Sequence, residues 1–185
     1  MSGLERLFIP SKSIVIADAD DLQFILHLQR KHSNALGFLP TPAIDWYINN
    51  SRVLLGREND TEAGYLLGRT HLRWNHGIRP ITQAAVAMDA MRRHLGLAML
   101  QRTETAAREA GQLALQASCR EGLDANEFWK AAGFEEICRL QPHNARRKLM
   151  IVWRKQITPV RPDWFNVPPP VAGWKAKRTT AIEHS

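Results

Sequence analysis

A segment that could hold an anion lies at residues 81–98, where an apolar strand pattern leads into a helix pattern. The first backbone N–H groups of a helix have no intrahelical acceptor and carry partial positive charge, so a phosphate binds there readily. Gly96 and Ala98 keep side chains away from the helix start, and Arg92 and Arg93 add two cationic groups beside it. These residues predict an anion site, and a diphosphate is its expected occupant.

The spacing of these residues excludes two common classes of phosphate-binding loop. A Walker loop ends in Gly-Lys followed by Ser or Thr, and that ending is missing here. A dinucleotide-binding fold needs Gly-x-Gly-x-x-Gly and an acidic residue about 20 positions later, and neither is present. The string Arg93-x-x-Gly96-x-Ala98 instead resembles the acyl-coenzyme A pyrophosphate loop of the GNAT superfamily of N-acetyltransferases.

The order of the surrounding segments is also similar to that superfamily over about residues 13–155. A central strand pattern at 84–86 precedes the loop, and a helix pattern to Ala110 follows it. Next come a strand pattern at 113–117, a short helix pattern that contains Asn126, and a Gly133-Phe134 step into another strand. More narrowly, residues 31–40 and 144–147 resemble a subgroup of small bacterial and phage acetyltransferases.

The resemblance implies that the chain binds acetyl-coenzyme A (acetyl-CoA) and passes the acetyl group directly to an amine. The thioester would lie in a V-shaped gap where strand 84–86 separates from strand 113–117. Backbone N–H groups near Val86 would hold the pantetheine arm and polarise the thioester carbonyl, as an oxyanion hole does, and Asn126 would hydrogen-bond the arm. The cofactor-binding residues that the resemblance implies are Ala85, Val86, Met88, Arg92, Arg93, His94, Leu95, Gly96, Leu97, Ala98 and Asn126.

Two positions at which many relatives carry acid–base residues hold other side chains in this sequence. Many relatives have a Glu as the base three residues before the Val86 position, where this chain has Gln83. Many have a Tyr as the acid for the leaving thiolate four residues before the Gly133 position, where this chain has Trp129. Glutamine takes up no proton at neutral pH, and an indole N–H is not a useful acid. Gln83 and Trp129 therefore mark the catalytic positions without supplying the expected groups.

His32 is a candidate for the missing base, because it ends the first predicted helix in the segment that covers the acceptor site in relatives. Imidazole exchanges its proton near neutral pH, although a surface histidine at a helix end is the alternative interpretation. Cys119 could carry an acyl group beside the gap, against the alternative of a buried structural thiol. His71 and His76 are five positions apart without further ligands, so no metal site is predicted.

The net charge of +7 favours anionic partners, namely nucleic acid, an acidic protein surface or a phosphorylated cofactor. The last predicted hairpin carries a cluster of basic residues, which is Arg139, Arg146, Arg147, Lys148, Arg154 and Lys155. This cluster could contact the 3′-phosphate of the cofactor or an anionic substrate, or it could be a solvated face.

The hydrophobic patterns predict one α/β domain, whose strands and helices would position these candidate residues. Strands are predicted at 13–17, 52–55, 64–67, 81–88, 113–117, 134–140 and 148–153, and helices at 18–33, 44–48, 89–110 and 124–132. Together with the resemblance, this order implies a GNAT-like fold, a mixed and strongly twisted sheet with helices on both faces. We expect that domain at residues 1–155 and a tail rich in Pro and Trp at 156–185. Prolines in the tail argue against regular structure. Its Trp164, Phe165 and Trp174 could form a strap over the core, which we favour, a lid on the acceptor site or a dimer clamp.

The composition is that of an ordinary globular protein, with 44% hydrophobic and 23% charged residues. The sequence shows no apolar run of bilayer length, no secretory signal pattern and only two cysteines, so a cytoplasmic monomer or homodimer is expected.

Three function hypotheses stay open. The first is an acetyl-CoA-dependent N-acetyltransferase whose acceptor amine belongs to a small molecule, a peptide or a nucleic-acid-linked group. The second is a catalytically weak coenzyme A-binding or protein-interaction module, which Gln83 and Trp129 favour. The third is an acyltransferase that acts on nucleic acid or aminoacyl-tRNA, which the net charge favours.

Overall fold

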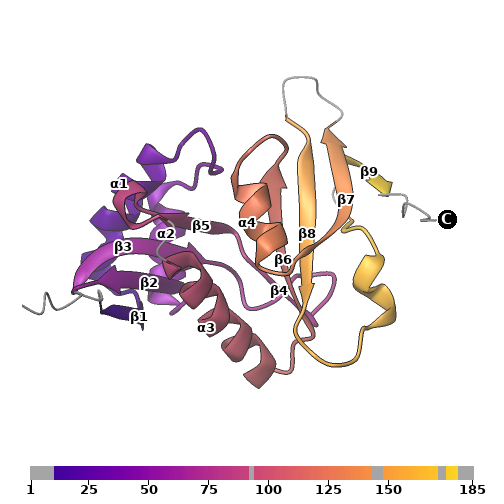
Figure 1. Ribbon diagram of the computed structural model, residues 1–185, viewed down its shortest axis with the longest axis horizontal. Helices are drawn as coiled ribbons and strands as arrows, with labels where there is room; N and C mark the ends of the chain where they lie inside the picture. The colour runs from indigo at the N-terminus through magenta and orange to yellow at the C-terminus, as the bar shows by residue number, and fades with distance from the viewer. Residues whose placement is uncertain (1–10, 92–93, 143–147, 171–173, 179–185) are drawn as a thin grey trace, which may run out of the picture.

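The computed structural model describes residues 11–91, 94–142, 148–170 and 174–178 (Figure 1). Two sheets run through this part of the chain. The N-terminal sheet has the strand order β1 (Lys12–Ile16), β2 (Val53–Glu58), β3 (Thr61–Leu67) and β5 (Gln83–Val86). The C-terminal sheet has the order β4 (Ile78–Pro80), β6 (Ala114–Arg120), β8 (Met150–Gln156), β7 (Glu135–Pro142) and β9 (Trp174–Arg178).

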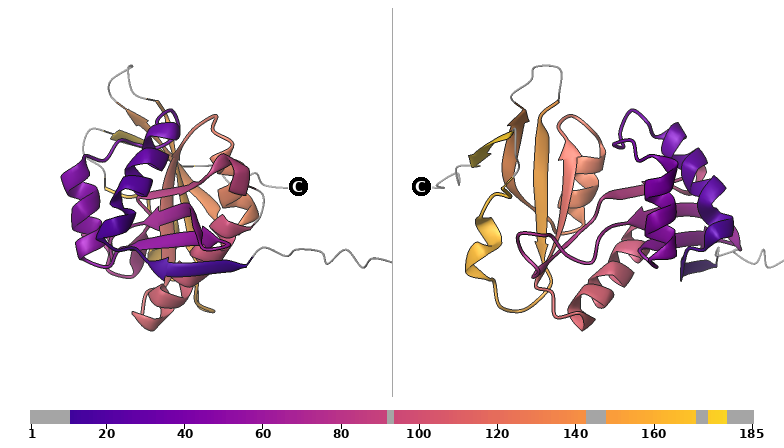
Figure 2. Two further views of the ribbon diagram at one scale, coloured as in Figure 1. Left: turned by 90° about the vertical axis from the view of Figure 1, so that its left-hand side faces the viewer. Right: turned by 180° about the vertical axis from the view of Figure 1, so that it is seen from behind.

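Helices cover both faces of this scaffold: α1 (Leu22–Lys31), α2 (Thr41–Asn49), α3 (Leu95–Glu109) and α4 (Ala125–Ala131). One face of the N-terminal sheet shares a hydrophobic core with α1 and α2, and α3 packs on the opposite face (Figure 2). The short α4 lies against β6 and β7. The predicted α/β fold, with a mixed sheet and helices on both faces, is confirmed. Among the helices of the described residues, none has the length and apolar character needed to cross a membrane.

The strand predicted at residues 81–88 is divided between the two sheets, which corrects the sequence interpretation. β4 pairs in parallel with β6, and the Ile81 N–H extends this pairing by donating to the Gln116 carbonyl at 2.7 Å. The next N–H, of Thr82, donates to the Leu67 carbonyl at 2.8 Å, and β5 then continues antiparallel to β3. The facing edges of β5 and β6 are therefore not bonded to each other, and we call this place the β5–β6 split.

The helix predicted from residue 89 begins six residues later, at Leu95. The intervening chain forms a 3-10 turn, η2 (Met88–Ala90), and His94 then adopts a left-handed backbone with a φ of 64°. A left-handed residue interrupts the helical path, so α3 cannot start before it. At the other end Gly111 has a φ of 71° and stops the helix, which agrees with the predicted end at Ala110.

The tail contains regular structure, contrary to the expectation from its prolines, because the prolines flank its two elements. Residues Asp163–Asn166 form a 3-10 helix, η3, and β9 adds an edge strand to β7. The expected strap is confirmed for two aromatic side chains. Phe165 is buried, and Trp164 packs so closely on Gly77 that a Cβ there would come within 2.9 Å of its ring. The side chain of Trp174 lies outside the described residues.

A buried arginine on β8 holds this tail. Arg154 donates to the backbone carbonyls of Trp164, Phe165 and Val167, at 3.2 Å to the first and the last. Its Nη2 also donates to Gln116 Oε1 on β6 at 2.7 Å. We call these groups the arginine network. It fixes η3 against the sheet because guanidinium groups provide several donors in a fixed fork.

Candidate functional site

The β5–β6 split leaves backbone groups of β5 without a strand partner. In an antiparallel ladder, residues whose N–H and C=O bond to the partner strand alternate with residues whose groups point to the other edge. The Ala87 N–H donates to the Ala63 carbonyl at 2.7 Å, so Ala85 also faces β3. The N–H and C=O groups of Ala84 and Val86 consequently point into the split.

The start of α3 provides a second set of free donors. The Ala98 N–H closes the first helical hydrogen bond, to the His94 carbonyl at 3.0 Å. The N–H groups of Leu95, Gly96 and Leu97 therefore have no acceptor within the helix. Three N–H groups without helical acceptors at the positive end of a 15-residue helix make this a favourable position for an anion.

These two sets of donors adjoin at Gly96. A Cβ built on Gly96 would lie 3.6 Å from Val86 Cγ2 and 3.5 Å from the ring of Phe128. Glycine thus leaves a recess between a β5 side chain and an α4 side chain. Gly96 at the helix start therefore lies close to Val86 on β5. Their contact with a cofactor stays a prediction.

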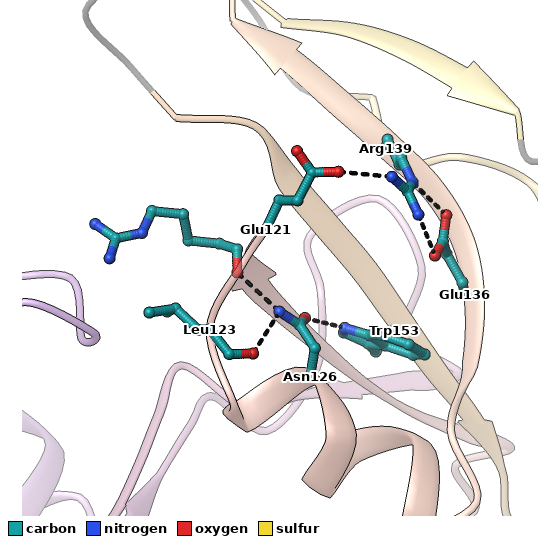
Figure 3. A network of polar contacts seen from close by, with 7 residues as sticks. Glu121, Leu123, Asn126, Glu136, Arg139 and Trp153 are labelled. Atoms are coloured by element: carbon teal, nitrogen blue, oxygen red, sulfur yellow. Dashed lines mark hydrogen bonds and ion pairs between the residues drawn. The ribbon is translucent and has the colours of Figure 1, made fainter.

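Asn126 lies at the first turn of α4, where it ties the end of β6 to β8 (Figure 3). Its Nδ2 donates to the carbonyls of Arg120 and Leu123, each at 2.9 Å, and its Oδ1 accepts from Trp153 Nε1 at 2.9 Å. Both amide hydrogens are used inside the protein, so only a second lone pair of Oδ1 is open to a ligand. Asn126 is first of all an anchor for the β6–α4 turn, and its contact with the cofactor arm stays a prediction.

His32 lies at the split, close to the backbone that the resemblance assigned to the thioester. It follows α1 directly, and its Nε2 lies 3.1 Å from the Val86 carbonyl. A carbonyl only accepts, so Nε2 carries the hydrogen and the neutral ring keeps its lone pair on Nδ1. The structure therefore brings together His32 and Val86, which are far apart in the sequence.

Gln83 is buried in a polar network rather than open to a substrate. Its Nε2 donates to Gln29 Oε1 at 3.0 Å and to the Gly37 carbonyl, and its Oε1 accepts from the Tyr65 hydroxyl at 3.0 Å. Gln29 in turn binds the N–H and the carbonyl of Leu39, at 2.9 and 3.0 Å. We call these groups the glutamine network. It fixes the segment after α1, and it uses both amide hydrogens of Gln83.

Trp129 is a core residue of α4. Its ring packs edge-on against Phe128 and Phe134, at centroid distances of 5.1 and 5.0 Å, and the residue is 7% exposed. Cys119 is also buried, and this burial raises the pKa of its thiol, so little thiolate is available for an acyl-cysteine route. The packing explains both side chains without a chemical role.

Solved structures identify the architecture. The ribosomal-protein-S18-alanine N-acetyltransferase from Escherichia coli superposes with a TM-score of 0.66 at 17% identity, covering 83% of this chain and 98% of that chain. A GNAT-family acetyltransferase from Bacillus cereus gives a TM-score of 0.65 at 16% identity, over 79% and 97% of the two chains. The chain has the GNAT fold. The protein yncA from Salmonella typhimurium, solved with its cofactor acetyl-CoA, gives 0.68 at 17% identity over 80% and 95%.

The GNAT fold is what these identities establish, since similarity at 16–17% does not carry a substrate or a mechanism. No protein-family model matches the sequence, and no curated protein matches it. The resemblance stated from the loop and the order of elements is confirmed at the level of the fold.

The remaining predicted site residues take different places around the GNAT split. Ala85 is buried and its backbone groups face β3, so they do not line the β5–β6 split. Leu95 is 1% exposed and packs against Gly56, so only its backbone can meet a ligand. The exposed Met88, the exposed His94 and the half-buried Leu97 and Ala98 surround the helix start. Arg92 and Arg93 lie outside the described residues.

The basic cluster predicted on the last hairpin is largely neutralised. Arg139 pairs with Glu121 at 2.6 Å and with Glu136 at 2.8 Å (Figure 3), and Lys155 pairs with Glu104. Arg154 is buried in the arginine network, Lys148 is exposed, and Arg146 and Arg147 lie outside the described residues. The described cations of this hairpin therefore do not form one anion-binding face, which corrects that interpretation.

Gln29 is the residue of this region that the sequence analysis missed. It lies on the stripe of α1 that also carries Ile25 and Leu26, and it is 3% exposed. A polar side chain at helical spacing within an apolar stripe needs hydrogen-bond partners when it is buried. The position of Gln29 within an apolar stripe is therefore the feature of the sequence from which the glutamine network could have been predicted.

Proposed function

We propose that the chain is an N-acetyltransferase that moves the acetyl group of acetyl-CoA directly to a primary amine within a ternary complex. The observation that carries this proposal is the meeting of two sets of free backbone N–H groups, at Val86 and at the start of α3. The first set suits a thioester carbonyl and its arm, and the second suits a diphosphate. A GNAT-fold neighbour with acetyl-CoA bound supports the choice of cofactor.

The chain's own residues fit such a cofactor. The N–H groups of Leu95, Gly96 and Leu97 would bind the diphosphate, and the recess at Gly96 would admit it next to the backbone. The Val86 N–H would donate to the thioester carbonyl. Acetyl-CoA supplies the activated acyl group when it is bound. Arg92 and Arg93 would add charge at the rim of the site.

His32 is the residue that we propose as the general base. An attacking amine must be neutral, so a protonated acceptor has to give up a proton on binding. The Val86 carbonyl holds the Nε2 hydrogen of His32, which leaves Nδ1 as the acceptor. Gln83 and Trp129 are engaged in the protein interior, so we assign protonation of the leaving thiolate to water.

Cofactor binding is tested by Gly96→Glu. We expect isothermal titration calorimetry to show a loss of acetyl-CoA affinity of at least about 100-fold, because a carboxylate would face the diphosphate. Gln101→Glu is the matched control, since it adds one negative charge at an exposed position of the same helix. Unchanged affinity in a folded Gly96→Glu variant would remove the assignment of the diphosphate site.

Turnover is tested by thiol release from acetyl-CoA with a panel of amines. The panel includes small amines, an amino acid, a peptide with an N-terminal alanine and an aminoacyl-tRNA, because the names of GNAT-fold neighbours include acetylation of a ribosomal protein alanine and of glutamate. With an accepted amine, the rate should rise between about pH 6 and 7, where imidazole groups generally lose a proton. His32→Ala should remove this rise and leave acetyl-CoA affinity unchanged. Binding without thiol release across the panel would favour the rival hypothesis of a coenzyme A-binding module.

A further inference from the structure

A cationic region lies away from the split, in the connection between β3 and β4. The sequence has no carboxylate between Glu62 and Asp89, and it has Arg69, Arg73 and Arg79 in that interval. Arg69 and Arg73 are exposed in the connection, and Arg79 is half-buried on β4. The connection is compact, because the Leu72 N–H donates to the Ile78 carbonyl at 3.0 Å.

A fourth guanidinium group in this region belongs to Arg52, which directly precedes β2. Its carbonyl accepts from the Gly68 N–H at 3.3 Å, directly beside Arg69. Burial lowers the pKa of Arg79, and the nearby charge of Arg52 lowers it further. We call Arg52, Arg69, Arg73 and Arg79 the basic surface.

The basic surface has no internal counter-charge. None of its four arginines forms an ion pair with any residue that the structure describes. Arg79 donates only to neutral groups, Gln112 Oε1 at 2.7 Å and the Ala106 carbonyl at 3.4 Å. Elsewhere Arg57, Arg108, Arg139 and Arg161 each pair with a carboxylate, whereas Arg30, Arg102 and Arg120 likewise form no ion pair with a described residue. Four unpaired arginines therefore lie in and beside one connection, where an anionic partner would be favoured.

Aromatic rings are exposed in the same region. The rings of His71 and His76, both exposed, lie with their centroids 4.1 Å apart and their planes inclined at 41°. The Arg52 guanidinium lies 4.7 Å above the ring of Trp46, which is 44% exposed. Flat rings beside unpaired guanidinium groups suit a partner with both bases and phosphates, because bases stack on rings and phosphates pair with arginine.

A groove of about 520 Å³ continues this region along the end of α3. It is lined by Arg108, Gly111, Gln112, Leu113, Gln156, Ile157, Thr158 and Pro159. Gln112 joins the groove to the basic surface, since its amide donates to the Thr70 carbonyl and accepts from Arg79. A chain that binds the arginines can therefore extend into the groove.

We propose that the basic surface, with the adjoining groove, binds single-stranded nucleic acid. Its arginines contact phosphates, and the His71–His76 pair and the Trp46 ring stack with bases. The surface lies where β6 begins, near Ala114, whereas Asn126 binds the Arg120 carbonyl at the other end of β6. A seven-residue strand spans about 20 Å, so this surface is separate from the proposed acetyl-CoA site.

The test is fluorescence anisotropy with a labelled single-stranded RNA and the same sequence as single-stranded DNA, measured without acetyl-CoA over a range of salt concentrations. We expect the Arg69→Glu/Arg73→Glu variant to bind at least about 10-fold more weakly than the wild type. The slope of log affinity against log salt should become smaller in magnitude by about 1.4, because each phosphate contact on a single strand contributes about 0.7. His71→Ala/His76→Ala should weaken binding without changing this slope.

The matched control is Arg30→Glu/Lys130→Glu, which makes the same change of charge at exposed positions on α1 and α4. It should keep affinity within about twofold of the wild type. An equal loss in both double variants would assign binding to net charge alone and overturn the proposal. Absence of binding at about 50 mM salt, or equally tight binding of polyglutamate, would overturn it as well. None of these outcomes depends on acetyl transfer, so the proposal can fail while the proposed function stands.

Discussion

The glutamine network and the arginine network have the same structural role, although only the second contains a charged side chain. Each fixes a loop to a buried strand through backbone carbonyls of that loop. Gln83 on β5 does this for the segment after α1 with neutral groups only. Arg154 on β8 does it for the tail with a cation that has no exposed surface. No carboxylate of the described residues bonds to either.

The difference shows how much a buried network depends on one member. Losing one neutral partner leaves unsatisfied amide or hydroxyl groups, which cost about 1–3 kcal/mol. A buried charge has already lost its hydration, and here burial lowers the pKa of Arg154 to about 10. The fold keeps this cation because Gln116 and three carbonyls accept its hydrogens. The tail should therefore depend more strongly on Arg154 than the α1 segment depends on Gln83.

The largest effect should come from Arg154→Met. Arg154→Met leaves three tail carbonyls and Gln116 Oε1 without donors, and each unsatisfied buried group costs about 1–3 kcal/mol, so the total should be about 3–5 kcal/mol. We expect a loss of that size in the free energy of unfolding, measured by urea denaturation. The control is Arg161→Met, because Arg161 is an exposed tail arginine paired with Glu135. Its loss should lower the free energy of unfolding by less than about 1 kcal/mol. Similar losses in the two variants would contradict the comparison.

Gln83→Glu should be the next most damaging change, although it restores the residue that many GNAT relatives carry. The Gln29 Oε1 and Gly37 carbonyl both need a donor at this position, and a carboxylate offers none. We expect a loss of about 2–4 kcal/mol at pH 7, more than for Gln83→Met at about 1–3 kcal/mol.

The pH dependence of this variant checks the cause. Burial among acceptors should raise the pKa of the introduced carboxyl above its unfolded value of about 4.3. The protonated form can donate, so the stability is present below about pH 4 and is lost as the pH rises. Denaturation curves for Gln83→Glu and Gln83→Met should therefore converge in acid. A Glu variant as stable as the wild type at pH 7 would show that the network is not needed.

The thiol of Cys138 provides a pH-dependent test of the buried region next to Arg154. Burial raises the pKa of this thiol from 9.0 to about 11, although the charge of Arg154 opposes the shift. The folded protein then holds the proton more tightly than the unfolded chain, so this stability is present below about pH 9 and is lost as the pH rises to about 11. We expect up to about 2–3 kcal/mol of such loss in the wild type. Cys138→Ala should lack this slope, and parallel pH curves would contradict the expectation.

The smallest effect should come from Tyr65→Phe, which removes one neutral hydrogen bond of the glutamine network. The Tyr65 hydroxyl donates to Gln83 Oε1 at 3.0 Å, and its loss should cost about 0.5–1.5 kcal/mol in thermal or urea unfolding. Tyr47→Phe is the matched control, because its hydroxyl lies at the longer distance of 3.4 Å from Thr82 Oγ1. A larger effect at Tyr47 would contradict the description of the network.

The distribution of basic residues shows where the sequence misleads. Arg139, Arg154 and Lys155 belong to one predicted hairpin, yet they have different surroundings. Arg139 forms an exposed ion pair, Arg154 is buried against the tail, and Lys155 pairs with Glu104 on α3. Arg52 and Arg79 are far apart in sequence, yet they lie near each other. Sequence proximity predicts a common surface poorly, because neighbouring residues of a strand point to opposite faces.

The sequence by itself determined what depends on local physics. Asp18 and Asp21 form a capping box at the start of η1 (Ala19–Asp21), where the sequence predicted a helix start, and Gly111 and Gly133 end helices with positive φ. The order of elements, together with the resemblance, implied the GNAT fold. The anion site that we propose at the start of α3 was also suggested by local spacing around Gly96.

Only the tertiary structure decided how distant segments share the interior. The division of strand 81–88 depends on competition between β3 and β6 for the same backbone groups, and no local pattern encodes it. The contact of His32 with Val86 and the burial of Gln83 likewise join segments that are far apart in the sequence. Arg154 looked like a surface cation because its acceptors come from a tail that the sequence pattern left unstructured. Buried polar residues take their roles from non-local hydrogen-bond partners, and those partners exist only once the chain has folded.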